Sequence, residues 1–183
     1  MSPRTAVCLL LGLASFAAGR SSAEQALPRI ANPEALAIEM AKALVSADRQ
    51  RFDALAATRE EMEGLLEAAQ PPSRPEERQE LKDKVAEILA DRGSDFDRFQ
   101  AMKKKAGVRK GAAVRFELIE LDAIHEKDGM KKVRHSRVRM FQTSEDGKKE
   151  DSFLIGLDDM FLFQRGWAFT SVSPGIGKET AKK

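Results

Sequence analysis

The sequence predicts an α+β fold, with N-terminal helices packed on a curved antiparallel sheet of four to five strands. Apolar residues recur at helical spacing from Pro33 to Ala106, and the period changes to two from Ala112 onward. The most apolar stretch of the globular part lies late, at residues 153–172, and the charged helices before it are its natural cover. Helices followed by strands are typical of an α+β domain.

The length and composition fit one globular domain. The chain has 183 residues, of which 42% are hydrophobic and 33% charged. We expect residues 33–173 to form this domain, after a flexible lead-in at 24–32 and before a disordered tail at 174–183. No apolar run after residue 23 reaches the length of about 20 residues that a membrane-spanning helix needs.

Residues 1–23 have the pattern of a cleaved signal peptide. A positive start at Arg4 precedes the apolar run Ala6–Ala18, and Ser21-Ser22-Ala23 supplies the small residues that a signal peptidase reads. We expect cleavage after Ala23, with Ala17-Ala18-Gly19 as a second site, and export to the periplasm or out of the cell. The alternative is a buried or membrane-bound N-terminal helix.

Export would change the chemistry that is available to the chain. Cys8, the only cysteine, lies in the removed segment, so the remaining chain would hold no disulfide and no thiolate metal site. Loss of Arg4 and Arg20 brings the net charge from +2 to zero, which removes the overall charge argument for nucleic-acid binding. The charge is still uneven, at −6 over residues 24–100 and +7 over 101–139.

Capping signals divide the helical half. Asn32-Pro33-Glu34 starts a first helix that runs to about Ala47, and Asp48 begins a second unit. Thr58 and Glu61 predict a capping box for a third helix. A fourth is expected to start at Ser73-Arg74-Pro75-Glu76, with Ser73 as its cap, to break or kink at Gly93-Ser94, and to end before Gly107.

The second half reads as a series of antiparallel strands. A phase slip at Leu118-Ile119 predicts a β-bulge in the first of them. Turns are expected at residues 127–129, at 145–147 and at Gln164-Arg165-Gly166, where glycine can adopt the positive φ of a hairpin turn.

This arrangement resembles the nuclear transport factor two-like cone fold of the cystatin-like group. Three features carry the resemblance: the link at residues 46–55 (SADRQRFDAL), the long bent strands from Val114, and the closing hairpin at residues 162–169 (LFQRGWAF). The long helical region at residues 75–106 departs from the family pattern. The resemblance implies helices in the concave face of a sheet, but no single function, because the fold serves both enzymes and proteins without known catalysis.

Enzymes of this group place an Asp or His inside the cone as acid or base, so the resemblance makes Asp122, His125 and His135 the catalytic candidates. Each has an ordinary alternative: His125 lies beside a turn, and His135 lies in a very polar strand. Two isolated histidines predict no metal site, and no sequence motif implies a cofactor.

The cations along residues 131–139 are a more specific signal of function than these three residues. By alternation His135, Arg137 and Arg139 share a face, with Val133 and Phe141 at its ends. If that face looked into the cone, it would bind an anion. If it looked outward, its charges would pair with acidic neighbours such as Glu117, Glu150 and Asp151. A second basic cluster, at residues 103–105, 109 and 110, would either touch an anionic lipid or polymer or be a solvated helix end.

We therefore expect an exported, non-enzymatic domain that binds a small ligand or an envelope protein. An open cone would place ligand-binding residues at its lining, namely Phe52, Phe116, Phe153, Ile155 and Trp167, with Arg137 and Arg139 as the anion-binding pair. One alternative is a small isomerase, cyclase or dehydratase that uses a buried Asp or His. Another is a homodimeric structural or interaction domain.

Overall fold

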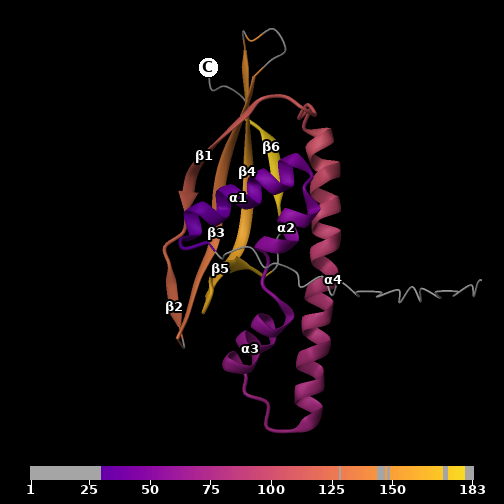
Figure 1. Ribbon diagram of the computed structural model, residues 1–183, viewed down its shortest axis with the longest axis vertical. Helices are drawn as coiled ribbons and strands as arrows, with labels where there is room; N and C mark the ends of the chain where they lie inside the picture. The colour runs from indigo at the N-terminus through magenta and orange to yellow at the C-terminus, as the bar shows by residue number, and fades with distance from the viewer. Residues whose placement is uncertain (1–29, 128, 144–146, 148, 171–172, 180–183) are drawn as a thin grey trace, which may run out of the picture.

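The computed structural model describes residues 30–127, 129–143, 147, 149–170 and 173–179. In this part of the chain four helices are followed by six strands in one antiparallel sheet, which confirms the predicted α+β class with at least one strand more than expected. Figure 1 shows α1 and α2 across one face of the sheet and α4 standing along its side. The predicted signal peptide lies outside the described residues.

The helices are α1 Pro33–Ser46, α2 Arg49–Leu55, α3 Arg59–Ala69 and α4 Pro75–Lys105. The predicted starts of α1 and α3 are confirmed, since Asn32 accepts a hydrogen bond from the Ala35 amide and Thr58 forms a capping box with Glu61. At α4 the prediction of Ser73 as the cap is wrong. Arg74 is the N-cap residue, and the Glu77 carboxylate accepts hydrogen bonds from the backbone N–H groups of Ser73 and Arg74.

Helix α4 is continuous, so of the break or kink predicted at Gly93-Ser94 the break is wrong. A Cβ on Gly93 would lie 3.2 Å from Nη2 of Arg49. The Arg49 guanidinium also sits 5.1 Å from the ring centre of Phe96, one turn further along α4. The glycine therefore marks the place where the side chain of Arg49 crosses the helix, not a helix end.

The strands are β1 Val114–Leu121, β2 His125–Lys127, β3 Met130–Thr143, β4 Glu150–Phe163, β5 Gly166–Phe169 and β6 Gly175–Lys178. The sheet order is β1-β3-β4-β5, with β2 paired to β3 and β6 paired to β4. The predicted bulge is confirmed, because the pairing of β1 with β3 shifts between Leu118 and Glu120. The predicted hairpin is also confirmed: Phe163 pairs with Gly166, whose φ is 116°.

Both ends of the domain are more ordered than the sequence predicts. Gly175–Lys178 forms β6 along β4, although residues 174–183 were expected to form a disordered tail. Ile30, in the expected flexible lead-in, accepts a hydrogen bond from the Trp167 amide at 2.9 Å. Backbone pairing accounts for both, and it leaves no periodic side-chain pattern for a sequence-based prediction to detect.

The alternation of buried and exposed side chains along β3 and β4 shifts by one residue near Asp159, which has a left-handed φ of 47°. Ser136 and Leu157 face the helices on one side of this irregularity, and Val133 and Met160 are buried on the other. The prediction that Val133 shares a face of the sheet with His135 is therefore wrong. Within the described residues no helix is long and apolar enough to cross a membrane.

Candidate functional site

The concave side of the sheet is filled at the positions predicted to line a ligand pocket. Phe52, Phe153 and Ile155 are fully buried and Trp167 is 4% exposed, all within one hydrophobic core. The Phe52 ring centre lies 5.2 Å from that of Phe96 and 4.7 Å from that of Phe169. These side chains hold α2, α4 and β5 together. Of the predicted ligand-binding residues, Phe116 alone lines the groove described below.

Arg137 and Arg139 lie on the face of the sheet opposite the helices. Arg137 pairs with Glu120 at 3.1 Å, and Arg139 makes two bonds to the Glu179 carboxylate, at 2.7 and 3.0 Å. The inward anion pocket is therefore wrong and the outward alternative is right. Of the expected acidic neighbours, Glu117 lies opposite Arg139 in β1, although the ion-pair partners are Glu120 and Glu179. The hydrogen bond to Glu179 raises the pKa of Arg139, and the charge of Glu117 helps to raise it. Glu150 pairs with Arg115 instead, at 3.6 Å.

The three catalytic candidates are not brought together in the concave core. His135 shares the outer face with Arg137, and its Nδ1 lies 2.6 Å from an Asp158 carboxylate oxygen. His125 is exposed in β2. Asp122 is half-buried, and its backbone N–H donates to the His135 carbonyl at 2.9 Å. Among the described residues, no three His, Cys, Asp or Glu side chains are grouped so that they could hold a metal ion.

Glu179→Gln is expected to loosen β6. The hydrogen bond from Arg139 lowers the pKa of Glu179, so its carboxylate stabilises the strand above its unfolded pKa of about 4.3 and loses that effect as the pH falls through the folded pKa. We expect amide hydrogen exchange in β6 to become about two- to fivefold faster in the variant at neutral pH. Glu126→Gln, which breaks the exposed pair with Lys131, is the control. Unchanged exchange in β6 would contradict this role.

A groove of about 890 Å³ lies where the C-terminal ends of α1 and α4 meet β1. Six of its lining residues are cationic and none is acidic, and apolar side chains complete its wall. We call it the basic groove; its lining residues are Lys42, Val45, Ser46, Ala47, Arg51, Lys103, Lys104, Val108, Arg109, Lys110, Gly111, Ala112, Val114 and Phe116. Its volume is within the range of small-molecule sites.

The C-terminus of α1 forms one wall of the basic groove. Ala47 takes a left-handed φ of 60°, which ends the helix and turns the chain into α2. Two side chains of α4 satisfy the last carbonyls of α1: Gln100 donates to Leu44 O and Lys103 donates to Val45 O, each at 2.9 Å. These contacts fix the Lys103 amine at the junction of the two helices.

The opposite wall is the segment between α4 and β1. Buried Gln142 of β3 holds this segment through its side-chain amide. Its Oε1 accepts a hydrogen bond from the Arg109 backbone N–H at 3.1 Å, and its Nε2 donates one to the Arg109 carbonyl at 2.9 Å. The Arg109 guanidinium donates to the Thr143 carbonyl at 2.7 Å. The segment that carries Val108 and Lys110 is thereby tied to the sheet.

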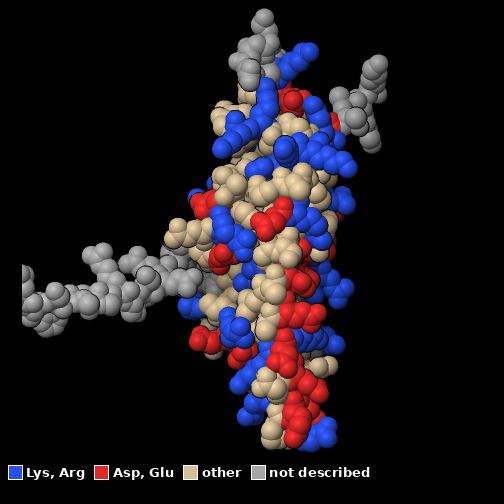
Figure 2. All heavy atoms as spheres, turned by 90° about the vertical axis from the view of Figure 1, so that its right-hand side faces the viewer, with Lys and Arg blue, Asp and Glu red and all other residues tan. Residues whose placement is uncertain are grey.

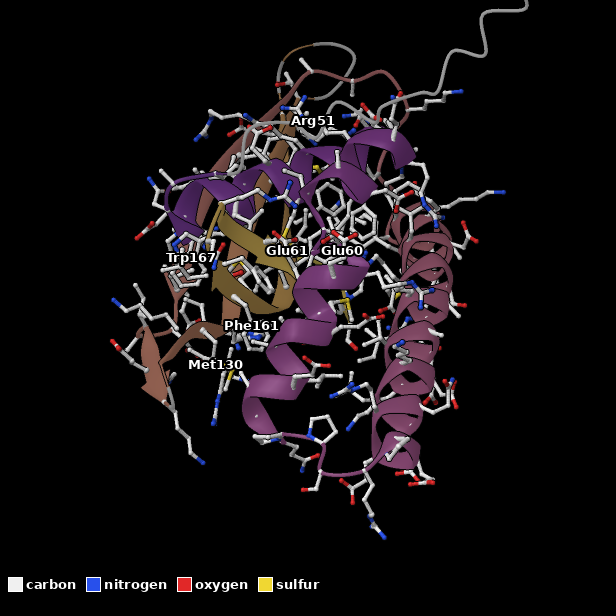
Figure 3. The ribbon with its side chains drawn as sticks, turned by 60° about the horizontal axis from the view of Figure 1, so that its bottom comes forward. Arg51, Glu60, Glu61, Met130, Phe161 and Trp167 are labelled. Atoms are coloured by element: carbon white, nitrogen blue, oxygen red, sulfur yellow. The ribbon has the colours of Figure 1, made fainter. Side chains whose placement is uncertain are left out.

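The charge of the basic groove is only partly balanced. Glu39 pairs with both Lys42 and Arg51. Burial raises the pKa of Glu39, but its bonds to these two cations outweigh burial and leave that pKa below the usual value. Figure 3 shows Arg51 apart from Glu60 and Glu61 of α3. Lys104 and Lys110 form no ion pair with a described carboxylate.

Lys103 experiences the excess positive charge most directly. Burial lowers the pKa of its amine, and the charge of Lys110 lowers it further. An anion in the groove would offset the second cause and favour the charged amine. The groove therefore combines an excess of positive charge with an apolar wall.

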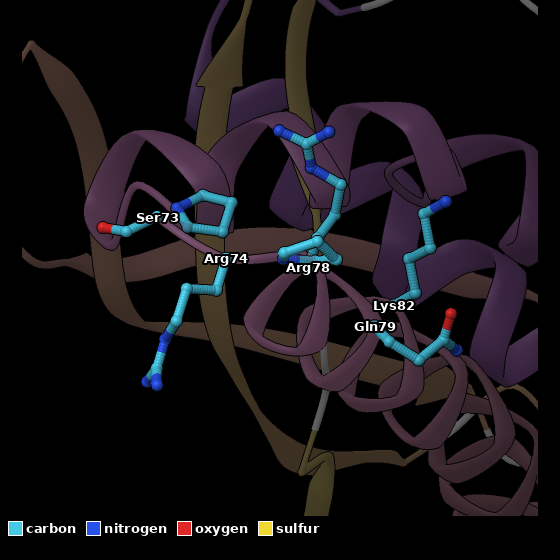
Figure 4. Close-up of a pocket in the computed structure, with 7 residues that line it drawn as sticks. Ser73, Arg74, Arg78, Gln79 and Lys82 are labelled. Carbon is cyan, nitrogen blue, oxygen red and sulfur yellow. The ribbon is translucent and has the colours of Figure 1, made fainter.

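A second hollow, of about 370 Å³, lies at the start of α4 and differs in character. Figure 4 shows Arg78 and Lys82 pointing to one side of it and Arg74 to another. Pro72 and Pro75 supply its only apolar lining. This hollow has cations but no apolar wall comparable to Val45, Val108 and Phe116.

Sequence reasoning found the basic cluster at the end of α4 but missed the residues that turn it into a groove. Lys42, Val45 and Arg51 come from the junction of α1 and α2, and Gln142 comes from β3. A polar residue at a buried position of a strand was the one available sign of Gln142. No known protein family, curated protein or solved structure matches this chain.

Proposed function

We propose that this protein is an exported, non-enzymatic binding protein whose basic groove holds an anionic amphiphile, a molecule with a carboxylate or phosphate head and an apolar tail. The observation that carries the proposal is the lining of the groove, in which six cations stand beside Val45, Val108, Val114 and Phe116 without an acidic residue. Charged groups fix the head of such a ligand, and apolar contacts supply much of its affinity.

A binding role is favoured over the two alternatives by where the charged side chains lie. His135 and Asp158 sit on an open sheet face, each with a side chain 37% exposed, whereas an acid or base in a cone enzyme would be enclosed. The same outer face carries the ion pairs of Arg137 and Arg139, so it lacks the apolar centre of a stable dimer interface. Export is proposed from the pattern of residues 1–23.

Calorimetric titration with laurate tests the proposed function. We expect laurate to bind and dodecyltrimethylammonium, which has the same tail and a cationic head, not to bind. Octanoate is expected to bind more weakly than laurate because each methylene that leaves the apolar wall costs up to about 0.8 kcal/mol. Equal binding of the two head groups would contradict the proposal, and so would the absence of laurate binding.

The double variant K104Q/K110Q locates this binding. Both side chains are exposed and form no ion pair with a described carboxylate, so their loss is expected to leave the fold intact. We expect laurate affinity to fall about tenfold, because each charge removed is expected to cost about 0.7 kcal/mol of binding free energy. The matched control K82Q/K84Q removes two exposed lysines of α4 outside the groove and is expected to bind like the parent protein. Equal weakening in both variants would place the ligand elsewhere.

A further inference from the structure

The basic groove belongs to a wider division of charge along the molecule. Five carboxylates lie along the exposed side of α4 at the spacing of one helix face, and we call them the acidic stripe: Glu76, Glu80, Asp83, Glu87 and Asp91. Figure 2 shows Lys and Arg gathered over the upper end of the molecule, and Asp and Glu running down the lower part of α4. In Figure 1 the end of α4 and the start of β1, which border the groove, lie at that upper end.

This division would orient the protein on a negatively charged surface. Such a surface attracts the end that carries Lys103, Lys104 and Lys110 and repels the acidic stripe of α4. The groove then faces the surface, with Val114 at its edge as one of the few exposed large apolar side chains, at 38% exposure. The end of the molecule that the charges would turn toward the surface therefore also carries an exposed apolar side chain that could contact it.

The apolar wall favours a lipid surface over a nucleic acid. Single-stranded nucleic acids bind through several aromatic side chains on which successive bases stack. The groove has one aromatic residue, Phe116, while its other apolar residues are aliphatic: Val45, Ala47, Val108, Ala112 and Val114. Aliphatic contacts beside cations match the boundary between phosphate headgroups and acyl chains.

We propose that the basic groove docks on an anionic phospholipid bilayer, with the phosphate of one lipid among Lys103, Lys104 and Lys110. The inference rests on the proposed function, because it names the membrane as the source of the amphiphile. The first acyl carbons of that lipid lie along Val45, Val108 and Val114, and the acidic stripe of α4 points away from the bilayer.

Co-sedimentation with vesicles tests the inference. We expect the protein to pellet with vesicles of phosphatidylcholine and phosphatidylglycerol, but not with phosphatidylcholine alone, and the binding to weaken with added salt. K104Q/K110Q is expected to reduce partitioning on the order of 20- to 30-fold, since each cation near an anionic surface contributes about fivefold. K82Q/K84Q is expected to change it less than twofold. All variants share one chain background, so any contribution of residues 1–23 is common to them.

The outcomes separate this inference from the proposed function. If laurate binds and K104Q/K110Q weakens it, but the vesicles do not bind, the groove takes a free amphiphile and the docking inference is overturned. Equal losses of vesicle binding in K104Q/K110Q and K82Q/K84Q would also overturn it, because the attraction would then not depend on the groove. If neither laurate nor vesicles bind, both proposals fall.

Discussion

Phe52→Ala is expected to lower the free energy of unfolding by about 3–5 kcal/mol. The side chain is fully buried, and its ring contacts Phe96 of α4 and Phe169 of β5. Removing it leaves a cavity at the point where three elements meet, and close-packed surroundings relax only partly into such a space. Denaturant unfolding followed by circular dichroism measures the change.

The same substitution tests whether the concave side of the sheet is filled. Phe52→Leu keeps most of the buried volume and is expected to cost clearly less than Phe52→Ala. Laurate affinity is expected to be unchanged in Phe52→Leu, because Phe52 does not line the basic groove. A loss of stability below about 1 kcal/mol in Phe52→Ala, together with weaker ligand binding, would show instead that Phe52 faces an open pocket.

Arg92→Ala is expected to cost about 3 kcal/mol of stability. Arg92 is 7% exposed, and its guanidinium donates to the Ala57 carbonyl at 3.2 Å and to the Thr170 carbonyl at 3.0 Å. It also sits 5.4 Å from the ring centre of Phe169. The substitution removes a charged hydrogen-bond donor from two carbonyl groups. It also removes the packing of the buried side chain, so both losses lower the stability.

Arg98→Ala is the matched control for Arg92. Both residues are arginines of α4, but Arg98 has a side chain 55% exposed and pairs with Asp95 on the same helix at 2.8 Å. The Asp95 side chain is only 14% exposed, but water reaches the Arg98 guanidinium, so Arg98→Ala is expected to cost clearly less stability than Arg92→Ala. Similar losses in the two variants would mean that Arg92 is not the link between α4, the start of α3 and the end of β5.

Local signals explain why much of the fold could be predicted. Asn32 and the Thr58–Glu61 capping box act within one turn of helix, and the Arg165-Gly166 hairpin needs only a short stretch of chain. The bulge in β1 was visible because the phase of its apolar residues slips at one position. In each case the residues that determine the structure are close together in the sequence.

Two of the failures came from residues whose partners are distant in the sequence. Gly93 looked like a helix break, but it accommodates Arg49 of another helix. β6 is poor in apolar residues, and its pairing with β4 depends on backbone bonds and on the contact of Glu179 with Arg139. Neither partner can be identified from the residues around the glycine or within the strand.

The candidate site was predicted in part for the same reason. The lysines at the end of α4 were visible as a cluster, whereas Lys42 and Arg51 join them only through the packing of α1 on α4. The arginines of β3 were equally conspicuous. Alternation shows that residues share a face, but it does not show which face the helices cover, so Arg137 and Arg139 could not be assigned to the outer face from the sequence.

Mapping laurate on the protein by nuclear magnetic resonance tests the central claim most directly, namely that the basic groove is the ligand site. In a titration followed by amide chemical shifts, the largest changes are expected at Val45, Lys103, Arg109, Lys110 and Phe116, with those of K104Q/K110Q smaller at the same laurate concentration. Changes centred on the core residues around Ile155, or on the outer sheet face around His135, would contradict the claim.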